Sequence, residues 1–156
     1  MTDVDTSIRR YTAGFLLHKT RVLLVRKSHP KWQQGMMNGI GGEIEPGEET
    51  DASFVREFLE ETGWNLANWR HELFCTEYGP GYEVNFYRAR LPDETDVGAV
   101  DWKCNDKGEE LEWCEVNSIK YPVIGNLHWL LPMALDPRPI WCQFHTNGDI
   151  RKIVTW

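Results

Sequence analysis

The stretch from residue 41 to residue 64 constrains this chain more than any other. It reads GGEIEPGEETDASFVREFLEETGW, and its centre has the pattern of a short helix. At about 100° per residue, apolar side chains gather on one arc of this helix and three carboxylates on another. The apolar residues are Phe54, Val55, Phe58 and Leu59, and the carboxylates are Glu57, Glu60 and Glu61. We expect Gly63 to end the helix in the left-handed conformation, and Thr50 or Asp51 to cap its start.

The clustering of carboxylates needs a physical explanation. Like charges three or four residues apart destabilise a helix by roughly a few tenths of a kcal/mol per pair. Arg56, four residues before Glu60, offsets only part of this repulsion. A hard divalent cation offsets it better, since Mg²⁺ prefers carboxylate oxygens and commonly bridges to substrate phosphates. The alternative is an ordinary solvated acidic face, which is the commoner meaning of Glu-x-x-Glu-Glu when it stands alone.

The residues that flank this helix decide between the two interpretations. Together with the helix they have the spacing G-x5-E-x7-R-E-U-x-E-E-x-G-U, where U is a bulky apolar residue. The residues at these positions are Gly42, Glu48, Arg56, Glu57, Phe58, Glu60, Glu61, Gly63 and Trp64. This spacing resembles the Nudix box with every fixed position filled, although aliphatic residues are usual where Trp64 stands. Nine constrained positions over 23 residues are far more specific than a lone Gly-rich loop.

The resemblance implies a fold and a metal centre. The fold is the α/β/α Nudix fold, a mixed β-sheet sandwiched between α-helices, here with a C-terminal β-hairpin. The cofactor is Mg²⁺, for which Mn²⁺ substitutes. The metal ligands that it implies are Glu57, Glu60, Glu61 and the backbone carbonyl of Gly41.

The resemblance also implies supporting residues and a later acid. Glu48 takes a supporting place, and we expect Arg56 to orient a glutamate through a salt bridge rather than to touch substrate. Many Nudix proteins use a further acid from a later loop as base or ligand, a few residues before a Trp-containing strand. Glu110 fits that place, with Glu109 as the alternative, whereas Glu112 is expected within the strand.

These residues suit the hydrolysis of a pyrophosphate linkage. Mg²⁺ held by carboxylates neutralises the phosphates, orients them and lowers the pKa of a bound water. A nearby carboxylate then takes the proton from that water. The other class that stays open is a binding module that senses a nucleotide without cleaving it. Because degenerate boxes mark many such modules and this box is intact, we favour the enzyme.

Composition limits the class of protein and its partners. With 156 residues, of which 41% are hydrophobic, the chain suits one domain over 1–156, with 1–10 as a loose lead-in. A net charge of −7 argues against nucleic acid as a partner. No apolar run approaches a membrane span and the start has no signal-peptide features, so we expect a cytoplasmic protein that is monomeric or homodimeric. The four cysteines form no C-x-x-C pair and are interpreted as reduced packing residues.

The rest of the chain has the pattern of several strands and a second helix. The strands are expected at 11–17, 21–26, 69–78, 82–90 and 110–116, and the helix at 124–135. Residues 28–37 and 91–109 are expected to be loops, with Trp102 packing back onto the protein. Two terminal strands, 141–146 and 149–155, flank Asn147-Gly148, which suits a type I′ turn of a hairpin.

Two substrate classes compete. Residues 38–42 and the terminal hairpin resemble MutT-type nucleoside triphosphate pyrophosphohydrolases, including 8-oxo-dGTP diphosphatases, in which an Asn at the place of Asn38 touches the base. Asn126 is a second candidate for the base edge, and Arg26 is a candidate for the phosphates. Pro80, 16 residues after Trp64, stands where ADP-ribose hydrolases often carry a proline. We predict a (d)NTP, oxidised or not, cleaved to a monophosphate and pyrophosphate, with ADP-ribose or a dinucleotide as the alternative.

Overall fold

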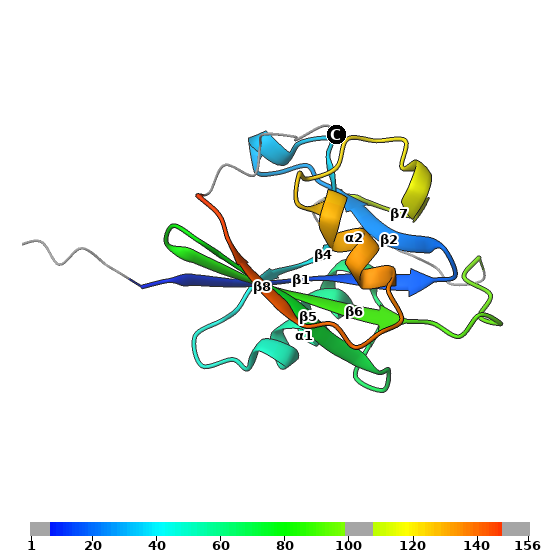
Figure 1. The fold of residues 1–156 in the computed structure, drawn as a ribbon, viewed down its shortest axis with the longest axis horizontal. Coiled ribbons are helices and arrows are strands. Elements are labelled where there is room, and N and C mark those ends of the chain that lie inside the picture. The colour runs from blue at the N-terminus through cyan, green and yellow to red at the C-terminus, as the bar shows by residue number, and fades with distance from the viewer. Residues whose placement is uncertain (1–6, 99–107, 148–156) are drawn as a thin grey trace, which may run out of the picture.

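A mixed β-sheet forms the middle layer of the protein (Figure 1). The computed structural model describes residues 7–98 and 108–147. Its strands are β1 Arg9–His18, β2 Arg21–Arg26, β3 Met37–Asn38, β4 Ile40–Glu43, β5 His71–Gly79, β6 Tyr82–Arg90, β7 Glu110–Glu115 and β8 Cys142–His145. The helices are α1 Thr50–Thr62 and α2 Leu127–Leu135, with short 3₁₀ turns at Lys31–Gln33 and Val116–Ser118. Every strand that the sequence predicted within the described residues is present.

Strand β1 organises the sheet. Along one edge it runs parallel to β6, and along the other it pairs antiparallel with β4 over residues 11–14 and with β2 over residues 16–18. Because β2 and β4 share this edge, the sheet divides there, and β2 continues to β7 on its other side. The pairing of β1 with β6 begins at Arg9 and Arg10, so the expectation of a loose lead-in is wrong for these two residues.

The two helices cover opposite faces of the sheet, as Figure 1 shows. Alternate residues of β1 separate the two cores, because successive side chains in a strand point to opposite faces. Phe15 and Leu17 pack in the core beneath α2, while Leu16 packs with Phe54 and Phe58 of α1. The α/β/α sandwich expected from the sequence is therefore confirmed.

Helix α1 departs from its predicted cap and its predicted faces. Neither Thr50 nor Asp51 caps it, because the Thr50 hydroxyl accepts a hydrogen bond from Arg10 and Asp51 pairs with His71. Gly63 does close the helix, at φ 76°, with its N–H donating to a carbonyl one turn earlier. Leu59, predicted to pack, is exposed, whereas Glu61, predicted on the acidic face, is buried. On the helical wheel Glu61 lies about 60° from the buried Phe58, whereas Leu59 lies about 100° from it, so Glu61 is closer to the centre of the buried face.

The second helix and the terminal strands also differ from expectation. Helix α2 begins at Leu127 rather than at residue 124. The N–H of Ile124 instead donates to the carbonyl of Met37, so Ile124 lies beside β3. Strand β8 runs parallel to β5 and is the first arm of the expected hairpin. The second arm, 149–155, lies outside the described residues, as does Trp102. No helix in the part of the chain that the structure describes is long and apolar enough to cross a membrane.

Candidate active site

Two glycines of β4 allow α1 and β1 to lie close to this strand. A Cβ atom on Gly42 would overlap the carboxyl group of Glu57, and a Cβ on Gly41 would overlap the carbonyl of Thr12 on β1. Neither position accepts a side chain without displacement of its neighbours. Gly42 therefore lets the Glu57 carboxylate lie directly against the backbone of β4, and Gly41 lets β4 lie close to β1.

Arg56 joins the acidic residues of the box into one network. Its Nε and Nη2 atoms donate to the two carboxylate oxygens of Glu48 at 2.7 and 3.0 Å. Nη1 donates to Glu57 at 2.8 Å and to Glu60 at 3.2 Å, and Nη2 also donates to the carbonyl of Glu43 at 3.2 Å. The expected salt bridge between Arg56 and a glutamate is thus present. A planar guanidinium can hold several acceptors at once, which suits a residue that positions carboxylates.

The network sets the charge state of its members. Hydrogen bonding to Arg56 lowers the pKa of Glu48 from its ordinary value of 4.5 to about 2. Hydrogen bonding to Glu48 in turn raises the pKa of Arg56. The Glu57 side chain is 13% exposed and that of Glu60 is 58% exposed. The first therefore lies inside the network, whereas the second faces solvent.

The residues of the box supply the donors that Mg²⁺ prefers, but they do not yet enclose an ion. Among the described residues, no group of three or more His, Cys, Asp or Glu side chains is already arranged around a metal position. The predicted ligands Glu57, Glu60, Glu61 and the Gly41 carbonyl offer hard oxygen atoms, which suit Mg²⁺ chemically. In this structure the guanidinium of Arg56 provides the positive charge beside Glu57 and Glu60.

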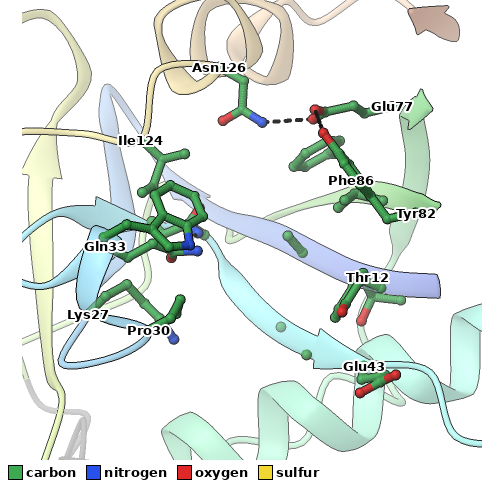
Figure 2. Close-up of a pocket in the computed structure, with 18 of the residues that line it drawn as sticks. Thr12, Lys27, Pro30, Gln33, Glu43, Glu77, Tyr82, Phe86, Ile124 and Asn126 are labelled. Carbon is green, nitrogen blue, oxygen red and sulfur yellow. Dashed lines mark hydrogen bonds between the residues drawn. The ribbon is translucent and has the colours of Figure 1, made fainter. Parts of the chain in front are cut away.

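A cavity of about 710 Å³ lies on the α2 face of the sheet (Figure 2). Its volume is within the usual range for small-molecule sites, about 300–1,000 Å³. One end reaches Gly41, Gly42 and Glu43 on β4, which Figure 2 shows beside α1, and the other reaches Glu77 on β5 and Asn126. The remaining lining residues are Tyr11, Thr12, Ala13, Lys27, His29, Pro30, Trp32, Gln33, Asn38, Gly39, Tyr82, Val84, Phe86 and Ile124.

The deep end of the cavity holds a buried carboxyl group. Glu77 is 1% exposed, and its two oxygens accept hydrogen bonds from Asn126 Nδ2 at 2.9 Å and from the Tyr82 hydroxyl at 3.0 Å. Burial raises the pKa of Glu77, and the two hydrogen bonds oppose this rise. Burial and the nearby Glu77 also raise the pKa of Tyr82.

The structure brings two of the three predicted substrate residues to the cavity. Asn38 lines it, donating to Gln33 at 3.2 Å and accepting from the N–H of Gly39 at 2.7 Å, so it also forms the local turn contact. Asn126 lines the deep end. Arg26 does not line the cavity; its guanidinium stacks 4.0 Å from the centre of the Tyr121 ring.

The two candidates for the later acid occupy different surroundings. The Glu110 side chain is 67% exposed and lies 3.7 Å from Arg26, which faces it across β2 and β7. Glu109 is buried and accepts hydrogen bonds from the Ser28 N–H at 3.0 Å and from Lys27 at 3.3 Å. Neither acid lines the cavity. Glu109 instead anchors the segment that carries the cavity residues Lys27 and His29.

Sequence reasoning missed several residues of this cavity. Glu77 and Tyr82 lie in predicted strands, where nothing in the local pattern separates a ligand-facing polar residue from a solvent-facing one. Trp32 gave a weak signal, because it is a large aromatic residue in an otherwise polar loop. Long-range pairing of β5, β6 and the start of α2 brings these residues together.

Comparisons with known proteins agree with this architecture. The NUDIX domain pattern matches residues 8–132. The solved MutT protein from Bacillus halodurans is similar at a TM-score of 0.67 and 20% identity, covering 94% of this chain and 95% of that chain. The MutT NUDIX hydrolase from Burkholderia pseudomallei has a TM-score of 0.66 and 18% identity, covering 80% and 96%. An ADP-ribose pyrophosphatase from Streptococcus suis has a TM-score of 0.64 and 14% identity, covering 90% and 100%.

No protein in the search of curated sequences matched this chain. Because these solved structures are at most 20% identical to this chain, their similarity shows a shared fold. The NUDIX match spans most of the chain, includes the complete box, and indicates an enzyme of the pyrophosphohydrolase class. On these grounds the chain belongs to the Nudix family.

Proposed function

We propose that this chain is a Mg²⁺-dependent hydrolase that cleaves a nucleoside triphosphate to a nucleoside monophosphate and pyrophosphate. The observation that carries the proposal is the continuity between the cavity and the box. The cavity reaches Gly41 and Gly42, and Gly42 lies directly against the Glu57 carboxylate. A nucleoside held in the cavity therefore directs its phosphates toward the carboxylates of α1.

The residues take distinct parts in this reaction. Glu57, Glu60, Glu61 and the Gly41 carbonyl would hold Mg²⁺, which when bound neutralises phosphate charge and makes a water more acidic. A carboxylate of the same helix, or the later acid, accepts a proton from the attacking water. Arg56, fixed by Glu48, keeps the Glu57 carboxylate at the β4 backbone.

The cavity supports a nucleoside better than it supports a purely polar ligand. Its lining includes the apolar residues Trp32, Val84, Phe86 and Ile124 together with polar side chains. This combination of apolar walls and a few placed polar groups is typical of sites for small ligands with aromatic rings. Asn38 lies on the same wall as Gln33 and is a candidate for a contact with the base.

ADP-ribose is the second candidate substrate. Pro80, at the position often occupied by proline in ADP-ribose hydrolases, lies in the turn between β5 and β6. Gly81 follows it with a φ of 72°. Turn chemistry alone explains both residues, because Gly tolerates this left-handed conformation without strain. The triphosphate is therefore preferred.

Product analysis tests the proposal. The chain would be incubated with Mg²⁺ and each (d)NTP, ADP-ribose or a dinucleotide at matched concentrations, and the products identified. We expect pyrophosphate and a monophosphate from at least one (d)NTP at the highest rate. Faster release of AMP and ribose phosphate from ADP-ribose would overturn the choice of substrate, and binding without any product would favour a sensor module.

A further inference from the structure

The carboxyl group at the deep end of the cavity has no part in the chemistry proposed at α1. Glu77 lies on β5 and is 1% exposed, yet it lines the cavity. Both of its hydrogen-bond donors, Asn126 and Tyr82, line the same cavity. Burial of a carboxyl group is costly unless hydrogen bonds compensate for it. A role in selecting the ligand explains why a buried carboxyl group lines a ligand cavity.

The amide of Asn126 is oriented by Glu77. A carboxylate only accepts hydrogen bonds, so the amide turns its NH₂ group to Glu77 and directs Oδ1 away from it. Figure 2 shows this arrangement, with the amide oxygen on the side away from Glu77. Asn126 is 4% exposed, and its Oδ1 has no hydrogen-bond partner within the described residues. A buried acceptor without a donor is rare, and in a ligand cavity it indicates a donor on the ligand.

The pair therefore presents acceptors to the ligand. A carboxylate has about four lone-pair sites, and two of those on Glu77 are occupied by Asn126 and Tyr82. The remaining sites on Glu77 and the amide oxygen of Asn126 are neighbouring acceptors. The matching ligand edge carries two adjacent donors and no acceptor between them.

Among the common bases, guanine alone has such an edge, formed by N1–H and the exocyclic amino group. Adenine and cytosine have one donor beside an acceptor along the same edge, and uracil and thymine have one donor between two acceptors. We propose that Glu77 and Asn126 select a guanine base, so that the substrate is a guanine nucleotide; the identification as substrate rests on the proposed function. Tyr82 is a positioning residue, because it donates to Glu77. An 8-oxoguanine base keeps both donors and fits the pair equally well.

Metal-free binding of nucleoside monophosphates tests this inference separately from catalysis. GMP, IMP and AMP differ at this edge: IMP lacks the exocyclic amino group, and AMP has an acceptor at N1. Calorimetric titration should give the tightest binding for GMP, with IMP weaker by about tenfold and AMP weaker still. Equal dissociation constants for the three nucleotides would overturn the inference.

Variants test whether Glu77 and Asn126 are the residues that select the base. Glu77→Gln replaces one acceptor oxygen by a donor group and should bring the GMP-to-IMP preference close to one. Glu72→Gln is the matched control: the same substitution on the same strand, at a residue that pairs with Arg88 outside the cavity. It should retain the preference of the unaltered protein. An unchanged preference in Glu77→Gln would contradict the assignment.

A second variant covers the case in which Glu77→Gln does not fold. Asn126→Ala removes the amide oxygen, and it loses no helix cap because Asn126 makes no side-chain capping bond to α2. It should lose the preference for GMP over IMP, and retention of that preference would contradict the inference. If GMP is preferred but no triphosphate is hydrolysed, the proposed function fails and the base selection stands.

Discussion

The acidic face of α1 and the deep end of the cavity both place carboxylates beside the substrate path, but in opposite environments. Glu57 and Glu60 of α1, together with Glu48 just before the helix, surround one arginine near solvent. In the cavity, Glu77 is buried and paired with neutral donors. Carboxylates near solvent and beside a cation are suited to metal binding and proton transfer, whereas a buried carboxyl group in fixed hydrogen bonds is suited to recognition. Under the two proposals above, catalysis and selection are carried by separate regions.

The largest effect should come from the carboxylates of α1. Glu57→Gln, Glu60→Gln and Glu61→Gln should each keep the fold and lower turnover by about a hundredfold or more, because each replaces an anionic ligand or base by a neutral group. Chelation should abolish activity, and added Mg²⁺ should restore it. Rates and thermal unfolding midpoints would be measured together. Full activity in all three variants, or in chelator, would refute the assignment of catalysis to α1.

A steric change at the junction of the two regions should come next. Gly42→Ala places a methyl group where the Glu57 carboxyl now lies, so turnover should fall by about tenfold or more with every nucleotide. Gly98→Ala is the control, since its nearest contact is the end of the Asp96 side chain at 3.3 Å. Steady-state kinetics of both variants give the comparison. Normal turnover in Gly42→Ala would mean that the position of Glu57 does not matter for the reaction.

Variants of the later acid, Glu110 or Glu109, test whether catalysis involves residues outside α1. We predict that Glu110, or failing that Glu109, reaches the metal cluster when substrate is bound, so that its Gln variant loses at least about tenfold in rate. Glu109→Gln should also loosen the segment at Lys27 and Ser28, which the unfolding midpoint would reveal. Normal rates in both variants would place the base within α1.

A change at Asn38 tests selection at the cavity wall beside Gln33. Asn38→Ala should weaken triphosphate turnover by a few-fold in a base-dependent way, because it removes an amide near the expected base position. Relative kcat/KM values across the four bases give the measurement. A uniform decrease would assign Asn38 to the shape of the loop, through its contacts with Gly39 and Gln33.

The smallest effect concerns stability at low pH. Because the pKa of Glu48 is depressed from 4.5 to about 2, its salt bridge with Arg56 stabilises the fold above pH 4.5 and loses this effect as the pH falls toward 2. Glu48→Gln should therefore be less stable than the unaltered protein at pH 6, and the difference in melting temperature should vanish near pH 2. Glu49→Gln, an exposed neighbour, should show no such convergence. A difference that is constant with pH would contradict the role of this pair.

The box was readable in the sequence because its spacing is local. Nine positions within 23 residues determine a helix, its closing glycine Gly63 and its carboxylates, and the structure contains each of these. The strands were also predictable, since alternation of apolar and polar residues indicates a strand with one buried face. The N-terminal cap of α1 was not, because Thr50 and Asp51 bind partners that are distant in sequence, Arg10 and His71.

Asn126 was named as a candidate for the base edge, but its pairing with Glu77 could not be predicted, for the same reason. Glu77 and Asn126 are 49 residues apart, and their contact depends on how β5 and the start of α2 approach each other. Arg26 was chosen as a phosphate contact from its place at a strand end. In the structure Tyr121 and β7 surround its side chain, and its part in binding stays a prediction.

The separation of catalysis from selection is tested most directly by one kinetic comparison. Turnover of GTP, ITP and ATP would be measured for the unaltered protein, Glu60→Gln and Glu77→Gln under identical Mg²⁺ concentrations. We predict that Glu60→Gln lowers kcat by a similar factor for all three nucleotides and keeps their order, whereas Glu77→Gln reduces the preference for GTP and keeps most of the turnover. A change of base preference in Glu60→Gln, or a uniform loss of turnover in Glu77→Gln, would contradict the account.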